Sequence, residues 1–190
     1  DELEAAQQEV LNSGGALNGV LRISTPLSFG VAHMSAAIAQ FMHAHPEIRI
    51  EMDLSDKRVD LVAEGFDLAI RIGVLSDSSL IAKKISWVKK IPCAAPDFLE
   101  RYPKITKPED LMDAPALVYS NDKSPADWSY TAPDGKSGVM RVSPKLTASN
   151  GDVLREAAIA GLGITCLPSF LHYDAINNGL LRPILTDYDW

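Results

Sequence analysis

The sequence predicts an α/β domain built of two lobes that are joined by two crossing strands. Three observations indicate this fold class. Apolar stretches of strand length alternate with segments of helical periodicity between residues 20 and 72. The same alternation begins again after Pro96, and two apolar stretches near 91–95 and 164–168 are placed to run between the halves. With 190 residues, 46% of them apolar, the chain can bury a core, and the two crossings should leave a cleft between the lobes.

The first half is expected to form a parallel sheet covered by helices. Thr25 and Pro26 supply a hydroxyl N-cap and a proline at the first helical position, and Met34, Ile38 and Phe41 then recur at helical spacing. The expected elements are a helix over 1–11, a strand over 20–24, a helix from 25 to about 44, a strand over 48–54, a short helix over 59–64 and a strand over 66–72.

The second half repeats this pattern with a hairpin inserted. Asp134-Gly135 is typical of a tight hairpin turn, and Gly161 ends a helix that begins after Ser149–Asp152. The expected elements are a strand over 85–95, short helices over 96–102 and 108–113, a strand over 116–119, a hairpin of 127–132 and 138–142, a strand over 146–148, a helix over 153–160, a strand over 162–167, a helix over 169–177 and a strand over 180–185.

The elements predict the domain organisation. Residues 1–18 are expected to be the end of a linker helix and a connector. Residues 19–92 together with 169–190 form the first lobe, and residues 93–168 form the second. The last stretch is placed with the first lobe because it has no complete core of its own and would gain most by returning to the first sheet.

Composition excludes several classes of function. The net charge of −7 argues against a nucleic-acid surface on this chain, which would need a basic face to replace phosphate counterions. No apolar run approaches the length of a membrane span. Two cysteines outside any CxxC pair fit a reducing compartment, and the chain is expected to be cytoplasmic. Two scattered cysteines and four scattered histidines give no metal-ligand spacing, and we expect no metal and no cofactor. Nucleophile, zinc-protease and phosphate-loop motifs are absent, and an enzyme is not expected.

Two helix starts are candidate ligand contacts, at residues 25–28 and 149–152. Backbone N–H groups and the positive end of a helix dipole suit a small anion such as a carboxylate. The same residues would be found if they only cap their helices, and the sequence leaves both interpretations open. Asp152 places a negative charge where an anion would bind, which weakens the second site.

Arg71 lies in an otherwise apolar strand and needs a partner. It could face the cleft and bind an acidic ligand, or pair internally with Asp67 or Asp53. Internal pairing is somewhat favoured, and both interpretations stay open.

Three blocks in order resemble the effector-binding domain of LysR-type transcriptional regulators. They are TPLSFGVAHMSAAIAQFMHAHPEIRIEM, DKRVDLVAEGFDLAIRIGVLSDSSLIAKKI and SNGDVLREAAIAGLGITCLPSF, and the resemblance spans about residues 17–185. It implies a fold like the type 2 periplasmic binding proteins, a small-molecule effector in the cleft between the lobes, and self-association as a dimer or tetramer. By position it implies ligand contacts at Thr25, Leu27, Ser28, Ala95, Pro96, Asn150 and Thr165.

The resemblance also implies parts that this chain lacks. DNA would be bound only through an N-terminal winged helix-turn-helix, to which residues 1–11 would lead. The family continues past LRPIL with a further strand and helix, so the first lobe is expected to lack its C-terminal part. The effector would favour one hinge angle between the lobes and thereby control DNA binding. The alternative function is a solute-binding protein of a transport system, which shares the fold.

Cys93 and Cys166 fall on the two crossing strands, which should be neighbours. A disulfide between them would lock the hinge and make redox state a second input. Two small buried strand residues are the favoured interpretation, and a disulfide requires Cα atoms within about 7 Å and converging Cβ vectors.

Overall fold

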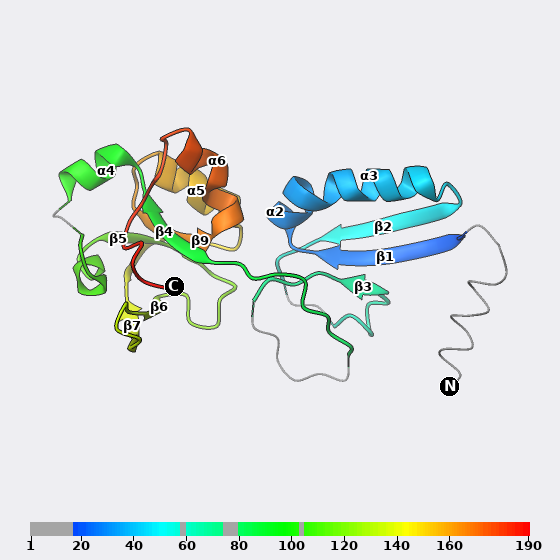
Figure 1. Ribbon diagram of the computed structural model, residues 1–190, viewed down its shortest axis with the longest axis horizontal. Helices are drawn as coiled ribbons and strands as arrows, with labels where there is room; N and C mark the ends of the chain where they lie inside the picture. Colours follow the sequence, from blue (N-terminus) through cyan, green and yellow to red (C-terminus); the bar gives the residue numbers. More distant parts are fainter. Residues whose placement is uncertain (1–16, 58–59, 74–79, 103–104) are drawn as a thin grey trace. The chain divides into compact units, whose positions relative to one another are not determined.

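The computed structural model describes residues 17–57, 60–73, 80–102 and 105–190. The chain divides into two compact units, Asp1–Arg71 and Ile72–Trp190 (Figure 1). The helix expected over residues 1–11 lies outside the described residues, as does the segment 74–79.

The first unit contains a three-stranded sheet in the order β2-β1-β3. β1 (Gly19–Thr25) pairs in parallel with β2 (Ile48–Leu54), and Thr25 lies opposite Leu54 at the carboxyl end of both strands. These two strands were predicted. The strand expected over 66–72 is reduced to β3 (Leu68–Ala69), because only these two residues pair with β1.

One helical segment follows β1 and lies along the sheet (Figure 1). It comprises α2 (Leu27–Phe29), the π-helical turn η1 (Gly30–Met34) and α3 (Ser35–Ala44). Met34, Ile38 and Phe41 are half-buried at helical spacing, and His45 ends the helix as expected. The interruption by a π-turn was not predicted.

The part of the expected helix 59–64 that the structure describes, residues 60–64, is not helical and forms a turn over 61–64. Residues 61–65 form turns, held because the Asp60 carboxylate accepts hydrogen bonds from the N–H groups of Val62 and Ala63, both 3.1 Å long. Gly65 closes the turn with a φ of +72°, a left-handed conformation that favours glycine.

The second unit is built on a five-stranded mixed sheet in the order β10-β4-β9-β5-β8. β9 is parallel to β5, β5 is parallel to β8, and β4 is antiparallel to β9. The strands are β4 (Lys90–Ala94), β5 (Pro115–Tyr119), β8 (Ser143–Ala148), β9 (Ile164–Pro168) and β10 (Arg182–Pro183). β6 (Asp127–Thr131) and β7 (Ser137–Arg141) form the predicted hairpin around Gly135.

Helices cover the second sheet and complete two buried clusters. α5 (Gly151–Ile159) and α6 (Ser169–Asn177) cover one face, which we call the helical face; its cluster includes Leu117, Leu154, Leu167 and Leu171. α4 (Pro96–Arg101), the short 3₁₀ helix η2 (Pro108–Leu111) and the hairpin cover the other face, which we call the hairpin face. Neighbouring strand residues alternate between the faces, which explains two separate clusters.

Residues 169–190 lie in the second unit, whereas the sequence placed them with the first lobe. β10 pairs with β4, and Leu171, Ala175 and Leu181 are buried in the cluster of the helical face. These residues therefore have a core to join without returning to the first sheet.

The strand expected over 85–95 begins only at Lys90. Residues 81–89 have no regular structure, and the side chains of Ile81 and Trp87 are 99% and 84% exposed. Apolar sequence alone does not make a strand where no neighbouring strand accepts its hydrogen bonds.

Candidate functional site

Thr25 is the predicted contact with the clearest structural signal. It is fully buried at the carboxyl end of β1, and its hydroxyl has no hydrogen-bond partner in the described part of the chain. It was expected to cap the following helix, but Pro26 occupies the N-cap position and makes no side-chain cap bond. A buried hydroxyl left unpaired costs about 1–3 kcal/mol, so this residue is a strong candidate to bind a polar group of a ligand.

The start of α2 is less open to an anion than the sequence suggested. The N–H of Leu27 donates a 3.0 Å hydrogen bond to the Asp56 carboxylate, which therefore already occupies the positive end of the helix. Leu27 is partly exposed, and Ser28 is half-buried with partners of its own. One of the N–H groups that were expected to bind an anion is thus already hydrogen-bonded to a carboxylate of the protein.

Arg71 is bound internally, though not by a carboxylate. Its guanidinium donates hydrogen bonds to the Ser24 hydroxyl (2.8 Å) and to the Ile70 carbonyl (2.9 Å). Partial burial lowers the pKa of Arg71, and Asp53 opposes that change from a distance. Among the described residues no carboxylate forms an ion pair with it, so neither predicted acidic partner is used.

Ser24 and Thr25 are consecutive strand residues and therefore point to opposite faces of the first sheet. Because Arg71 binds Ser24, its guanidinium lies on the face opposite to the Thr25 hydroxyl. Arg71 is placed to hold the end of β1, and the strand separates it from the Thr25 hydroxyl.

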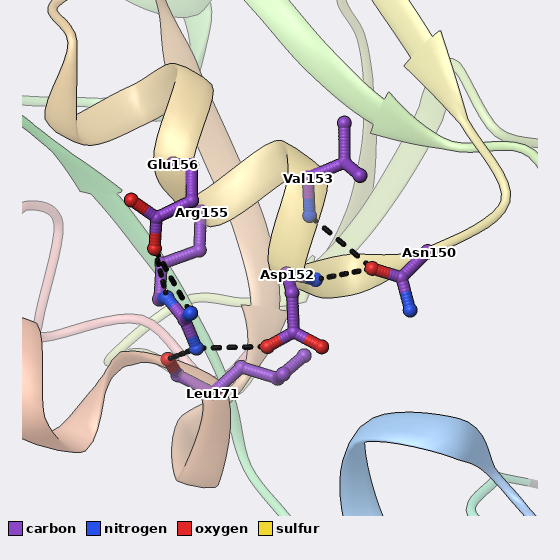
Figure 2. A network of polar contacts seen from close by, with 6 residues as sticks. All are labelled: Asn150, Asp152, Val153, Arg155, Glu156 and Leu171. Atoms are coloured by element: carbon purple, nitrogen blue, oxygen red, sulfur yellow. Dashed lines mark hydrogen bonds and ion pairs between the residues drawn. The ribbon is translucent and has the colours of Figure 1, made fainter.

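In the second unit Asn150 caps α5 (Figure 2). Its side-chain oxygen accepts hydrogen bonds from the N–H groups of Asp152 (3.0 Å) and Val153 (3.2 Å). The Asp152 carboxylate is paired with Arg155 at 2.8 Å, so its charge is compensated. Arg155 also binds Glu156 and the Leu171 carbonyl, which ties α5 to α6. Capping, one of the two interpretations left open, is what the geometry shows.

The strand register separates Ala95 and Pro96 from Asn150. Asn150 follows the carboxyl end of β8, which is parallel to β5 and β9. Ala95 and Pro96 follow β4, which runs antiparallel to β9, so they lie at the amino end of β9. Ala95 is buried as the N-cap of α4. These predicted contacts therefore lie at opposite ends of one sheet.

Thr165 lies in the middle of the second sheet. It pairs with Cys93 on one side and Leu117 on the other, and it is fully buried. Its hydroxyl has no partner within the described residues. Unlike Thr25, which ends its strand, Thr165 is enclosed between a sheet and its helices.

Polar residues that the sequence analysis missed follow the parallel strands of the second sheet. Asn121, just after β5, donates a 3.2 Å hydrogen bond to the Ser149 carbonyl, and Lys90 forms a 2.8 Å ion pair with Asp122. Ligands of open α/β sheets bind beyond the carboxyl ends of strands. Their position directly after the expected strand 116–119 could therefore have indicated Asn121 and Asp122 as candidates.

The two cysteines are free and buried strand residues, the interpretation favoured from the sequence, and they do not form the alternative disulfide. Cys93 lies opposite Thr165 and Cys166 lies opposite Pro92, so the two thiols point to opposite faces of the sheet. Cys93 belongs to the cluster of the helical face and Cys166 to that of the hairpin face. Burial raises the pKa of both thiols to about 12, which keeps them protonated and unreactive. The strands β4 and β9 are neighbours, as expected, and their register excludes the bridge. Both belong to the second unit, so they do not run between the two units as the sequence predicted.

His172 is a buried titratable residue that sequence reasoning passed over. It is fully buried in α6, and neither ring nitrogen has a hydrogen-bond partner within the described residues. Burial, reinforced by the charge of Arg155, lowers the pKa of His172 to about 4, although the nearby backbone of Ile91 opposes the change. The sequence could have indicated that His172 is buried, because it lies beside Leu171 and one turn before Ala175 on the apolar side of a predicted helix.

Other site types find no support within the described residues. They contain no group of three or more His, Cys, Asp or Glu side chains that could hold a metal ion. None of their helices is both long and apolar enough to span a membrane. A shallow hollow lies beside Met112, Pro115 and Lys145, at the amino ends of β5 and β8, and it contains no predicted contact.

Comparisons with known proteins give a consistent result. Residues 14–189 match the family model described as the LysR substrate binding domain. An uncharacterized HTH-type transcriptional regulator of Haemophilus influenzae is 34% identical over 187 residues, which are 98% of this chain and 65% of that protein.

Two solved structures share the fold and part of the sequence. The full-length Vibrio cholerae virulence activator AphB is 30% identical with a TM-score of 0.81, over 98% of this chain and 63% of that one. The CrgA regulatory domain of Neisseria meningitidis is 27% identical with a TM-score of 0.76, over 91% of this chain and 86% of that one. The chain spans 59–65% of the length of the first curated relatives it matches.

Proposed function

The chain belongs to the LysR substrate-binding domains, the effector-binding domains of LysR-type transcriptional regulators, and from this we propose which residues bind the effector. Membership confirms the resemblance of the three sequence blocks and the fold class like that of type 2 periplasmic binding proteins. It also confirms that the chain is a regulatory domain and not an enzyme. Family membership favours a regulator over a solute-binding protein of a transport system.

We propose that Thr25 is the principal effector contact of the first unit, with Leu27 and Ser28 beside it. The observation that carries the proposal is the buried, unpartnered hydroxyl of Thr25 at the carboxyl end of a parallel strand. A threonine hydroxyl can donate to a carboxylate or carbonyl and accept from a hydroxyl or amine. A small polar molecule such as a carboxylate fits this chemistry, and Arg71 acts by holding the strand end through Ser24.

In the second unit we propose that the effector contacts the carboxyl ends of β5 and β8. Asn121 and Asn150 lie there, and Lys90 adds a positive charge that Asp122 partly compensates. Ala95, Pro96 and Thr165 are left out of this proposed set because the register places them elsewhere in the sheet. The proposed effector acts by its differential affinity for two states of the domain, and so shifts the balance between them.

We further propose the activity of the whole protein. A winged helix-turn-helix N-terminal to the effector domain would bind DNA, the regulators would self-associate through this domain, and they would act in the cytoplasm. The relatives named above are HTH-type regulators, which supports this assignment. The acidic character of this chain, with a net charge of −7, agrees with DNA contacts made by a different domain.

A pair of matched variants tests the effector site. Thr25→Val and Thr165→Val each replace one buried, unpartnered hydroxyl by a methyl group, and both should raise the stability of the ligand-free domain by about 1 kcal/mol or more. Binding of acetate, succinate, citrate and benzoate is measured by thermal shift and calorimetry. We expect Thr25→Val to weaken the tightest of these at least five-fold and Thr165→Val to leave it unchanged. Equal affinities in both variants and the wild type would overturn the assignment.

A further inference from the structure

We infer that Ser35, which is outside the proposed contacts, is a positioning residue: it stabilises the π-turn that sets how Leu27 and Ser28 are presented beside Thr25. The inference rests on the proposed function, since it concerns the same effector site. It starts from an unexplained feature, the π-helical turn Gly30–Met34 inside an otherwise α-helical segment. Single π-turns are rare, and they are frequent at functional sites.

The hydrogen bonds of Ser35 show what maintains the π-turn. Its backbone N–H donates to the Gly30 carbonyl, five residues back, and not to the Val31 carbonyl, which an α-helix would use. The Ser35 hydroxyl lies 3.0 Å from that Val31 carbonyl and 3.2 Å from the Gly30 carbonyl. The Ser35 hydroxyl can therefore donate a hydrogen bond to the Val31 carbonyl, which would accept from the Ser35 backbone N–H in an α-helix but does not in the π-turn.

The π-turn lies directly against Thr25. A Cβ atom on Gly30 would be 2.9 Å from the Thr25 methyl group and 2.5 Å from a methyl group of Leu54, so glycine permits the close approach. Gly30 is also the acceptor of the π-type bond. The residue that opens the π-turn is thus the one that packs on the proposed effector contact.

The consequence follows from helix geometry. A π-turn accommodates about one residue more than an α-turn, and each residue of an α-helix advances the direction of side chains by about 100°. Downstream, Met34, Ile38 and Phe41 keep a half-buried stripe on the sheet. Upstream, the side chains of Leu27 and Ser28 are therefore rotated about the helix axis by about 100°, compared with their directions in an uninterrupted α-helix. Losing the π-turn would turn these two side chains away from their present directions.

The first experiment reads the π-turn without any ligand. Amide hydrogen exchange is compared in the wild type, Ser35→Ala, Ser35→Thr, and the double variant Ser35→Ala/Ala36→Ser, which moves the hydroxyl by one residue. We expect exchange at residues 30–35 to be about five-fold faster in Ser35→Ala and in the double variant, the size expected for one net hydrogen bond. Ser35→Thr keeps the hydroxyl and should restore protection. Unchanged exchange in Ser35→Ala would overturn the inference.

The second experiment reads the site. Deletion of Ala32 removes one residue from the π-turn, and a crystal structure should show a continuous α-helix with Met34, Ile38 and Phe41 still on the sheet. Benzoate, or whichever of acetate, succinate and citrate binds the wild type most tightly, should bind the deletion variant and Ser35→Ala three- to ten-fold more weakly. Persistence of the π-turn after the deletion, or unchanged affinity, contradicts the inference. If the wild type binds none of the four, the effector proposal fails for these acids, and the exchange and crystal results still decide the role of Ser35.

Discussion

The two units bury their chains in different ways. In the described part of the first unit, Ile23 is the one fully buried hydrophobic side chain, and the others buried to that degree are Ser24 and Thr25. The second unit has two clusters, one on each face of its sheet, that include Phe98, Leu111, Leu117 and Leu154. The first unit is held chiefly by a parallel backbone ladder and a half-buried helix, and the second by close packing. The contrast teaches that Thr25, the proposed principal contact of the first unit, lies in the less packed unit, where a bound ligand adds proportionally more stability.

The largest expected effect tests this difference with one substitution made in each unit. Phe98→Ala removes a side chain that is 1% exposed and should cost the second unit about 3–5 kcal/mol. Phe41→Ala removes a half-buried ring in α3 and should cost less than half as much. Hydrogen exchange of β5 and of β1 measures each unit separately. Similar losses in the two units would show that the packing contrast does not govern stability.

A pH titration sharpens the comparison through His172, which has no buried counterpart among the described histidines of the first unit. Its pKa is about 4 in the folded chain against an ordinary 6.5, so the unfolded chain takes up the proton first as the pH falls. Stability is complete above about pH 6.5 and declines by about 2–3 kcal/mol towards pH 4. His172→Phe should flatten this decline in urea unfolding, whereas His43→Gln, at an exposed position, should leave it unchanged. If the stability of His172→Phe declines with falling pH as steeply as that of the wild type, His172 is not the cause of the decline.

Glycine-to-alanine substitutions test how well each unit accommodates an added methyl group. A Cβ on Gly163 would lie 2.5 Å from the Pro115 carbonyl, a backbone atom of the neighbouring strand, and Gly163→Ala should cost about 1–3 kcal/mol. A Cβ on Gly30 would meet the partly exposed side chain of Leu54, which can rotate, and the methyl group of buried Thr25 at 2.9 Å. Gly30→Ala also gains helix propensity, which offsets part of the cost, so its net loss should be smaller than that of Gly163→Ala. Melting curves of the two variants check this order, and a larger loss for Gly30→Ala would reverse it.

The smallest expected effect concerns the helix caps. Asn150→Ala removes a side chain that accepts two N–H bonds at the start of α5 and should cost about 1 kcal/mol. Asp56→Ala removes the hydrogen bond that the Leu27 N–H donates at the start of α2 and should cost about 0.5 kcal/mol. Asn150→Asp keeps the cap and serves as the control in denaturant unfolding. A greater loss for Asp56→Ala would show that the first unit depends more on its cap than its packing indicates.

The sequence by itself determined the elements whose signal is local. The strands β1 and β2, the stripe of Met34, Ile38 and Phe41, the hairpin at Gly135 and the helix α6 were predicted from periodicity and turn residues, and three sequence blocks identified the family. These features depend on neighbours along the chain, which a sequence displays directly.

The tertiary structure decided what depends on register and burial. It made Thr25 a buried strand end instead of a helix cap, pointed Cys93 and Cys166 to opposite faces, and separated Ala95 from Asn150 by the length of a sheet. It also shortened the strand expected over 85–95 and packed residues 169–190 on the second unit. The physical reason is the same in each case: pairing a strand one residue further along exchanges its faces, and no local pattern states which residue of a distant strand lies opposite.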